Sequence, residues 1–409
     1  MKVEHVRDYV VERLPYALNP RSIAVVGASR YTTKVGYKVI EGLKNWGYQG
    51  KIYPVNPRTS MMHGMKAYPR VCDIPDEVDL VFIAVPAHIV KSVLEDCVKK
   101  EAKIVVIATS AFKEIGRGEL QNELTQYCRD HKLPLIGPNL VGMGSPYLNF
   151  NCGFIPYLPK KGPVAMISQS GANLLAALGT SQKDHFGMSF FVGLGNKADV
   201  DFCEFIAYAD KDEHTKCVSV YIEGLDSPEA FVEACRAVNK PIVAIKVGGS
   251  KIGVKAAFAH TASENPNADS FYDEIFQEAG AIRATTWQQF LDISLALGMP
   301  PPLKGDNIVM ITNGGGSGLL SCDHFERCGL PLHELAEISP NLAQRIRAYM
   351  PMFGSPLNPV DISGTATPIQ YKGAFTQAMR DPNVDGILGS ICPTAVTDVD
   401  AVVDVVIAI

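Results

Sequence analysis

His260 lies in a loop that follows a short apolar run, residues 241–247, which ends at Gly248 and Gly249. An imidazole titrates near neutral pH and can act as an acid, a base or a carrier nucleophile. In an open α/β sheet, ligands collect beyond the carboxyl ends of the strands, so this loop is well placed for a catalytic group. Because His260 is one of nine histidines, its role depends on which other groups reach the same edge.

Two further groups follow predicted strands and are expected at the same edge of the sheet. Ser168, Ser170 and Gly171 begin a helix, where backbone amides and hydroxyls can bind an anion. Glu223 follows the predicted strand Val218–Tyr221, and a carboxylate beside His260 fixes its tautomer and favours its charged form. Taken singly, the serines are a capped helix start and the glutamate a solvated strand end. Together they predict a site for phosphoryl transfer.

A different site is predicted near the N-terminus, where Gly27 forms a turn after the first strand. Its amides and the following helix can hold phosphate, although Gly27 and Gly36 are too far apart for a dinucleotide fingerprint. The second strand ends near Arg58, where an NAD enzyme usually has an acidic residue, so a phosphorylated ribose of coenzyme A or NADP fits better. The predicted cofactor-binding residues are Gly27, Ala28, Ser29, Lys34, Asn56, Pro57, Arg58 and Pro86.

A third glycine-rich turn, at Gly314 and Gly315, also joins a predicted strand to a helix. It suits a phosphate or a carboxylate, but it contains no obvious nucleophile, so we assign it a binding role only. A glycine turn that merely allows close packing is an equally open interpretation.

Short Val/Ile-rich runs alternate with amphipathic helical stretches, which indicates an α/β protein with parallel sheets. We expect domains at residues 1–150, 160–299 and 305–409, the last two as copies of one flavodoxin-like unit. The expected strands are Ser22–Val26, Lys51–Val55, Leu80–Val85, Ile104–Ala108, Leu135–Ile136, Val164–Ile167, Met188–Val192, Val218–Tyr221, Ile242–Lys246, Ile308–Ile311 and Gly386–Leu388.

The composition of the 409 residues is that of a globular protein, with 47% hydrophobic and 20% charged residues. A net charge of −5 gives no basic field for nucleic acid or membrane, so we expect neither as a partner. Ten cysteines without a CxxC pair predict no metal site and a reduced, cytoplasmic protein. There is no signal-like start and no membrane-length apolar run. Residues 404–409 end inside an apolar segment, so we expect the domain to continue beyond them.

Nine short motifs occur in an order and spacing that together are highly specific. They are Val26–Ser29, Tyr53–Pro57, Ile136–Asn139, Ser168–Gly171, Gly195–Asp199, Tyr221–Gly224, His260–Thr261, Thr312–Gly315 and Asn358–Asp361. Through them the chain resembles the nucleoside-diphosphate-forming acyl-CoA synthetases, or ADP-forming acetate–CoA ligases, which are relatives of the succinyl-CoA synthetase α subunit.

The resemblance implies a Rossmann-like domain that binds coenzyme A, followed by two flavodoxin-like domains of the succinyl-CoA synthetase type. It implies that His260 is the phosphohistidine and that Glu223 supports it. The family reaction is acyl-CoA + ADP + phosphate ⇌ carboxylic acid + CoA + ATP, through an acyl phosphate. ATP or ADP and Mg²⁺ belong to an ATP-grasp unit that this chain lacks. That unit is expected as a β-type subunit or as further C-terminal domains of an oligomeric enzyme.

The chain departs from the family pattern around its predicted nucleophile, where Ala259 and Ala262 replace serine and glycine. Leu140 stands where the family often has cysteine. Two alternatives remain open from the sequence, an NADP-linked oxidoreductase and a non-catalytic CoA-binding module. The oxidoreductase lacks a recognisable set of catalytic residues beside the turn. The small carboxylic acid, and the choice of ADP or GDP, are not set by these motifs.

Overall fold

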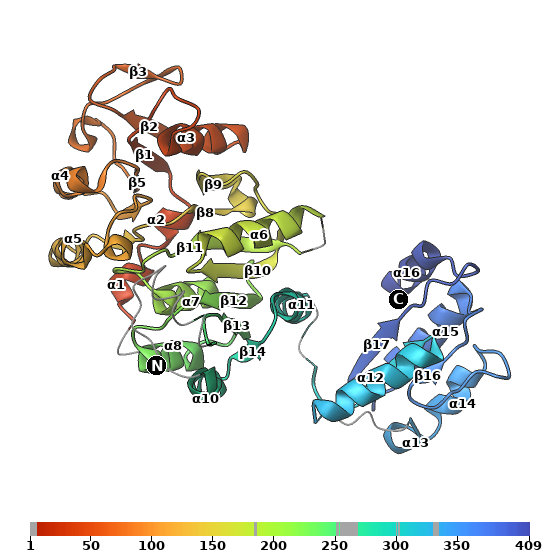
Figure 1. Cartoon of the computed structure of the whole chain (residues 1–409). Coiled ribbons are helices and arrows are strands. Elements are labelled where there is room, and N and C mark those ends of the chain that lie inside the picture. The colour runs from red at the N-terminus through yellow and green to blue at the C-terminus, as the bar shows by residue number, and fades with distance from the viewer. Residues whose placement is uncertain are drawn as a thin grey trace. The chain divides into compact units, whose positions relative to one another are not determined.

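A computed structural model shows two compact units, Met1–Pro300 and Pro301–Ile409, and each is described by itself (Figure 1). His260 lies outside the described residues, as do its neighbours in the loop. The structure describes residues 6–183, 186–250, 253, 269–299, 301, 303–329 and 335–409.

The first sheet of the larger unit contains the five strands expected from the sequence. They are β1 (Ser22–Val26), β2 (Lys51–Val55), β5 (Leu80–Ile83), β6 (Ile104–Ile107) and β7 (Leu135–Ile136). All pair in parallel, in the spatial order β2-β1-β5-β6-β7. By position in the chain this is the 2-1-3-4-5 order of flavodoxin-like sheets, whose switch point lies between the first and third strands.

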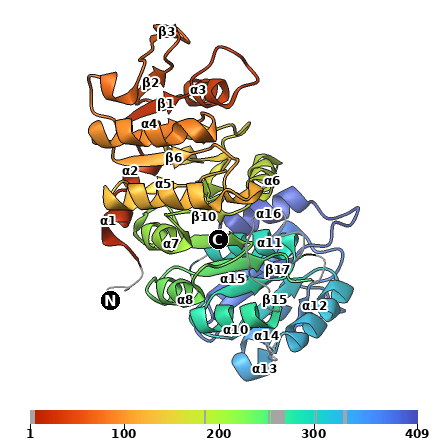
Figure 2. The ribbon, with the colours of Figure 1, turned by 60° about the vertical axis from the view of Figure 1, so that its left-hand side comes forward.

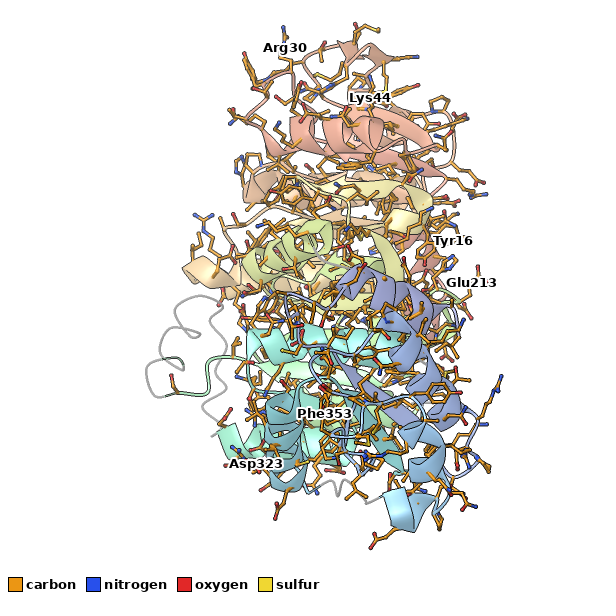
Figure 3. All side chains as sticks on the ribbon, turned by 90° about the vertical axis from the view of Figure 1, so that its right-hand side faces the viewer. Tyr16, Arg30, Lys44, Glu213, Asp323 and Phe353 are labelled. Atoms are coloured by element: carbon orange, nitrogen blue, oxygen red, sulfur yellow. The ribbon has the colours of Figure 1, made fainter. Side chains whose placement is uncertain are left out.

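Both faces of the first sheet are buried. Successive side chains of a strand point to opposite faces, and those of β1 enter two different hydrophobic clusters. Ile23 and Val25 pack on one face, and Ala24 and Val26 pack on the other. Two helices visibly cover one face (Figure 2), and side chains fill the space between the layers (Figure 3). The helices of this region are α1 (Asp8–Val11), α2 (Pro15–Leu18), α3 (Val35–Asn45), and, on the face seen in Figure 2, α4 (Ala87–Lys99) and α5 (Gly118–Asp130).

The second sheet repeats this order and extends it with antiparallel strands. Its parallel part, β14-β13-β12-β10-β11, again follows the 2-1-3-4-5 pattern. Three strands were not expected, because they are short and two are rich in glycine: β8, β9 and β14. The strands are β8 (Gly142–Ser145), β9 (Phe150–Gly153), β10 (Lys161–Ser168), β11 (Met188–Gly193), β12 (Cys217–Ile222), β13 (Ile242–Lys246) and β14 (Ile282–Ala284).

One hydrophobic core joins the first and second sheets, since Ile23 and Val25 of β1 belong to the same buried cluster as Ala165 and Ile167 of β10. The two sheets therefore form a single packed unit, and the expected boundary between their domains remains a prediction. The helices around the second sheet are α6 (Gly171–Lys183), α7 (Phe202–Lys211), α8 (Pro228–Arg236), α10 (Asp269–Ala279) and α11 (Trp287–Gly298).

The smaller unit contains a parallel sheet with the order β16-β15-β17 among its described residues. This is the 2-1-3 beginning of the same pattern. Its elements are β15 (Ile308–Thr312), α12 (Gly315–Arg327), α13 (Leu335–Ile338), α14 (Leu342–Arg347), β16 (Val360–Asp361), α15 (Pro368–Met379), β17 (Gly386–Ser390) and α16 (Val399–Ile407). Across the described residues of both units, no helix combines the length and the apolar character that a membrane span requires.

Candidate functional site

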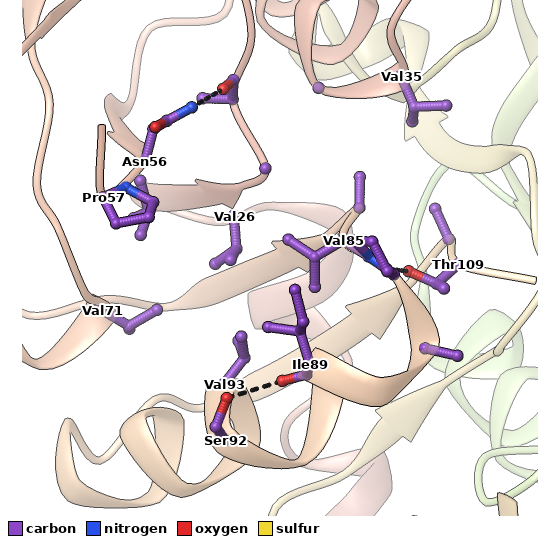
Figure 4. A pocket seen from close by; sticks show the side chains of 18 of the residues that line it. Val26, Val35, Asn56, Pro57, Val71, Val85, Ile89, Ser92, Val93 and Thr109 are labelled. Carbon is purple, nitrogen blue, oxygen red and sulfur yellow. Dashed lines mark hydrogen bonds between the residues drawn. The ribbon is translucent and has the colours of Figure 1, made fainter. Parts of the chain in front are cut away.

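A cavity of about 1100 Å³ opens at the carboxyl ends of β1, β2, β5 and β6. This is the switch point of the first sheet, where open α/β sheets bind ligands. Figure 4 shows the loops that surround it. All eight residues predicted to bind a cofactor line this cavity: Gly27, Ala28, Ser29, Lys34, Asn56, Pro57, Arg58 and Pro86.

Two glycines allow the backbone to close tightly beneath the cavity. Gly27 has φ of 90°, and a Cβ on it would lie 2.3 Å from the carbonyl oxygen of Ala84. A Cβ on Gly36, in the first turn of α3, would lie 2.0 Å from the oxygen of Gly27. The helix start therefore sits directly against the turn, and the turn residues Gly27, Ala28 and Ser29 line the cavity. The wide spacing of these glycines in sequence serves this packing and is no dinucleotide fingerprint.

Asn56 holds two rims of the cavity together. Its Nδ2 donates to the oxygen of Ala28 over 2.8 Å, and its Oδ1 accepts from the amide of Arg58 over 2.8 Å. The turns after β1 and β2 are thereby joined, and the Arg58 backbone is fixed at the cavity. A guanidinium in this place suits a phosphate group on a ribose.

The opposite wall of the cavity was not predicted from the sequence. It includes His88, Thr109, Ala111 and Arg117, and Thr109 Oγ1 donates to the oxygen of Val85 over 2.7 Å (Figure 4). The available signal was the run Thr-Ser-Ala directly after β6, because it follows the carboxyl end of a strand as the other loops do.

In the second sheet, the predicted serine turn is held mostly by its own hydrogen bonds. Ser168 Oγ donates to the oxygen of Ser170 and accepts from its amide, at 2.9 and 3.1 Å. Ser170 Oγ caps α6 by accepting from the amide of Asn173 over 3.3 Å. Both serines are buried. The amides of Gly171 and Ala172 lie in the first turn of α6, where helix amides have no partner within the helix, so they are the donors that an anion would meet.

Gln169 brings the turn after β10 against the turn after β12. Its Oε1 accepts from the amides of Glu223 and Gly224, at 2.6 and 3.0 Å. Its own amide donates to the oxygen of Tyr221 over 3.1 Å. The structure therefore places the backbone of Glu223 against Gln169, the residue that precedes Ser170, at the switch point of the second sheet. The third member of the predicted set, His260, belongs to residues that the structure does not describe.

Polar side chains that the sequence did not reveal support this edge. Asn173 Nδ2 donates to Tyr221 Oη over 2.8 Å and to Ser170 Oγ over 3.1 Å. Burial, followed by the negative charge of Glu223, raises the pKa of Tyr221 to about 12. The tyrosine therefore stays neutral and can serve as a hydrogen-bonding group. No pattern in the sequence distinguishes Tyr221 from an ordinary core residue of a strand.

Lys246 is a cation at the end of the neighbouring strand, β13. Its Nζ donates to the oxygen of Val247 over 2.6 Å and lies 4.5 Å from the ring centre of Tyr272. Burial lowers the pKa of Lys246, against the opposing effect of Asp269. The rim thus combines acidic and basic groups, which is the mixture that phosphoryl chemistry uses.

In the smaller unit, the side chain of Asn313 joins two turns at the switch point of the sheet, as Gln169 does in the larger unit. Asn313, after β15, accepts from the amide of Cys392 and donates to its oxygen, at 2.6 and 3.0 Å. A Cβ on Gly314 would lie 3.0 Å from Cys392, and one on Gly315 would lie 2.7 Å from the Asp361 carboxylate. Both glycines therefore lie close to neighbouring side chains, and a larger residue at either position would require Cys392 or Asp361 to move. No cluster of three or more metal-ligating side chains occurs within the part of the chain that the structure describes.

Comparison with known proteins settles the family. Residues 21–145 match the model of a CoA binding domain, residues 161–297 that of a succinyl-CoA ligase like flavodoxin domain, and residues 308–408 that of a ligase-CoA domain. The chain is 38% identical to the α subunit of acetate–CoA ligase [ADP-forming] I of Pyrococcus furiosus. That alignment covers 95% of this chain and 85% of the relative. The chain belongs to the ADP-forming acetate–CoA ligase family.

Further relatives agree with this assignment. The acetate–CoA ligase [ADP-forming] of Methanocaldococcus jannaschii is 37% identical over 88% of this chain, which spans half of that relative's length. Among solved structures, the dinucleotide forming acetyl-coenzyme A synthetase 1 of Ca. Korarchaeum cryptofilum, in complex with phosphate and ADP, has a TM-score of 0.91 at 36% identity. It covers 97% of this chain, and this chain covers 85% of it.

The predicted family, the predicted fold class and the assignment to acyl-CoA ligases are therefore confirmed. The NADP-linked oxidoreductase that the sequence left open finds no support in these relatives. The roles of the individual site residues and the three domain limits remain predictions.

Proposed function

We propose that this chain is the α-type part of an ADP-forming acyl-CoA synthetase, which converts carboxylic acid, CoA and ATP to acyl-CoA, ADP and phosphate. The observation that carries the proposal is the position of two candidate sites at the switch points of two sheets that share one core. The cavity of the first sheet has the volume for a large cofactor. At the second sheet, the first-turn amides of α6 follow the turn that Gln169 joins to Glu223.

In the proposed mechanism, the turn at Gly27–Ser29 and the residues Lys34 and Arg58 hold the phosphates of coenzyme A. Asn56, Pro57 and Pro86 shape the walls. A thiol held in this way attacks an acyl phosphate, which gives the thioester and releases inorganic phosphate. In the reverse direction phosphate attacks the thioester carbonyl, and the thiol leaves.

In this proposal, the phosphoryl group binds and is transferred at the carboxyl edge of the second sheet, beside the turn at Ser168–Gly171 and Glu223. The amides of Gly171 and Ala172, at the positive end of α6, stabilise the phosphoryl oxygens. His260 accepts the phosphoryl group, and Glu223 orients the imidazole and stabilises its charge. Ser168 and Ser170 shape the turn, and Gly314 and Gly315 are proposed as a second phosphate-binding turn.

The nucleotide and Mg²⁺ are proposed to bind to an ATP-grasp unit outside this chain, either a β-type subunit or further domains. We expect the active enzyme to be an oligomer in the cytoplasm. All ten cysteines are unpaired thiols, which supports a reducing compartment.

The acid is proposed from the relatives. Those named for acetate are 34–38% identical to this chain, whereas those named for 4-hydroxybutyrate and trans-ferulate are 29% and 28% identical. Acetate is therefore the first acid to test.

The test is thioester formation by the chain together with an ATP-grasp β-type subunit. Purified proteins are mixed with CoA, Mg²⁺, ATP or GTP, and one acid from a panel, and the thioester is measured by mass spectrometry. Acetyl-CoA formation that depends on both proteins supports the proposal. An intact complex that makes no thioester from any acid in either direction contradicts it.

A further inference from the structure

Two motifs that carry the family resemblance have no role in the proposed mechanism, and they lie against one another. One is the loop after β11, residues 194–200, and the other is the strand β7 with the loop that follows it, residues 135–140. Three backbone hydrogen bonds join them: Asn196 to the Pro138 oxygen over 2.9 Å, Ala198 to the Gly137 oxygen over 2.9 Å, and Val200 to the Leu135 oxygen over 3.1 Å. The first sheet is thereby fastened to the second at their carboxyl ends.

The two loops approach too closely for a side chain at position 195. Gly195 has φ of 56°, and a Cβ on it would lie 2.2 Å from the oxygen of Pro138 and 2.3 Å from that of Asn139. Glycine is required here for both reasons. The contact is therefore a specific, close junction.

The side chain of Asn196 crosses this junction and reaches into the first domain. Its Nδ2 donates to Glu114 Oε2 over 2.8 Å and to Gln121 Oε1 over 2.9 Å. Its Oδ1 accepts from Asn139 Nδ2 over 3.2 Å. Both N–H donors and the carbonyl oxygen are used, so three of the four hydrogen bonds that an amide side chain can make are formed.

Two of these partners support the wall of the CoA cavity. Glu114 Oε1 accepts from the amide of Ala111, a cavity residue held at φ of 79°. The backbone amide of Asn139 donates to the backbone oxygen of Thr109 over 2.9 Å, and Thr109 also lines the cavity. Asn196 is therefore one residue removed from the cavity wall on two separate paths.

The loop after β11 also contacts the turn after β10, where the phosphoryl site is proposed. The amide of Leu194 donates to the oxygen of Ser168 over 2.8 Å, and Ser168 begins the turn that holds the amides of Gly171 and Ala172. Hydrogen bonds therefore link the cavity wall to Asn196, and the backbone from Asn196 to Leu194 continues this connection to Ser168 in the predicted phosphoryl site.

Glu114 accepts these hydrogen bonds as a carboxylate. Partial burial raises the pKa of its carboxyl, but the hydrogen bond from Asn196 and those from backbone amides outweigh this effect, and the net pKa is below its usual value. A donor is consequently required opposite Glu114, and an acceptor placed there would be repelled.

We infer that Asn196 is a positioning residue that holds the CoA cavity in register with the phosphoryl site, so that the thiol reaches the acyl phosphate. This inference rests on the proposed function. In the step concerned, a bond forms between the thiol sulfur and the acyl carbon, and the carbon–oxygen bond to phosphate breaks. The thiol proton passes to the released phosphate. Asn196 touches no reacting atom, and a misplacement of about 1 Å would cost up to about a hundredfold in rate.

A loss of register should affect the two half-reactions differently. Formation of the phosphohistidine from ATP uses only the phosphoryl edge and the ATP-grasp unit, whereas thioester formation from acetyl phosphate and CoA needs both sites in register. Loss of the register should therefore lower kcat for the thioester step while the affinity for CoA and the phosphorylation rate stay nearly unchanged.

Asn196→Asp tests this, because it keeps the size of the side chain and places an acceptor against Glu114. In the complete enzyme with its ATP-grasp unit, we expect kcat for acetyl-CoA formation from acetyl phosphate to fall by about tenfold to a hundredfold. Phosphoryl labelling from ATP and the Kd for CoA should stay within about twofold. The double variant Asn196→Asp with Glu114→Gln restores a donor–acceptor pair and should recover most of the rate. The matched control is Asn122→Asp, an exposed asparagine on α5.

Equal loss of both half-reactions, or unchanged thioester formation, would overturn the inference. If Asn196→Asp fails to fold, Glu114→Gln alone serves, because it weakens the same junction by exchanging one acceptor; selective loss of thioester formation supports the inference and an unchanged rate contradicts it. Failure of the proposed function itself is recognised separately, since the unmodified enzyme would then form neither phosphoenzyme nor thioester.

Discussion

At the scale of single residues, the side chain of Gln169 joins the turn after β10 to the turn after β12, so its removal is predicted to lower ligase activity. Gln169→Ala leaves the amides of Glu223 and Gly224 without their acceptor, which costs about 1–3 kcal/mol, and releases Glu223 from its position. We expect ligase activity to fall about tenfold to a hundredfold. Gln182→Ala, an exposed glutamine at the other end of α6, is the matched control and should leave activity unchanged. Equal activity of the two variants in a steady-state assay would refute this role.

The residues that were predictable at this scale are those that follow a strong strand pattern. Ser170 and Glu223 were found because each comes directly after a Val- and Ile-rich run, so the fold class alone places them on one edge. Gln169, Asn173 and Asn196 were not assigned roles, because each acts through a partner that is distant in sequence. Such pairs depend on how the turns pack, and packing is not visible in local periodicity.

At the scale of elements, the contact of α3 with the turn after β1 predicts that Gly36 tolerates no side chain. Gly36→Ala places a methyl group 2.0 Å from the oxygen of Gly27, so the helix start must move away from the cavity. We expect a loss of about 1–3 kcal/mol in the free energy of unfolding and weaker binding of CoA in titration calorimetry.

Gly179→Ala is the control for that variant, because Gly179 is also helical and no atom lies within 4 Å of its added Cβ. This change should stabilise the protein by about 0.4–1 kcal/mol. A Gly36→Ala protein as stable as Gly179→Ala would show that the packing of α3 is not as described.

The start of β1 is held by a buried carboxylate, Asp79, which predicts a pH effect. Burial raises the pKa of Asp79, but hydrogen bonds from the side chain and backbone of Arg21 outweigh burial, and the net pKa is lowered. Its stabilising effect is therefore complete above the pKa of the unfolded state and is lost as the pH falls through the lower folded-state pKa. Because Arg21 is largely exposed, solvent screening limits the effect to about 1–2 kcal/mol.

Asp79→Asn should accordingly lower stability at pH 7 and flatten the acid limb of the stability curve, as measured by urea unfolding between about pH 3 and pH 7. Asp130→Asn, at the exposed end of α5, should change neither. Parallel acid limbs for Asp79→Asn and the unmodified protein would contradict the assignment.

Most strands of the parallel sheets were predictable, because apolar runs between turns identify buried parallel strands, whereas the short strands β14 and β16 were missed. The antiparallel pair β8 and β9 was missed, since its Gly-Met-Gly-Ser and Phe-Asn-Cys-Gly segments have no such run. β8 pairs with β11 and β9 pairs with β8, so the neighbouring sheet dictates these strands and overrides a weak local preference.

At the scale of the whole molecule, the division into Met1–Pro300 and Pro301–Ile409 predicts where CoA binds. Every residue that lines the large cavity belongs to positions 26–117, so a folded fragment of residues 1–300 should bind CoA with the affinity of the full chain, within about threefold. Titration calorimetry measures this, and circular dichroism establishes folding. A folded fragment that does not bind CoA would place essential contacts in the smaller unit.

The central claim is that this chain carries a phosphoryl group on His260 between the CoA-linked site and the nucleotide. The most direct measurement is incubation of the chain and its ATP-grasp unit with Mg²⁺ and ATP labelled at the γ-phosphate. We predict a label that is labile in acid and stable in base, that maps to His260, that disappears in His260→Ala, and that persists in His214→Ala. Absence of label from a complex that makes acetyl-CoA, or a label that survives His260→Ala, would contradict the account.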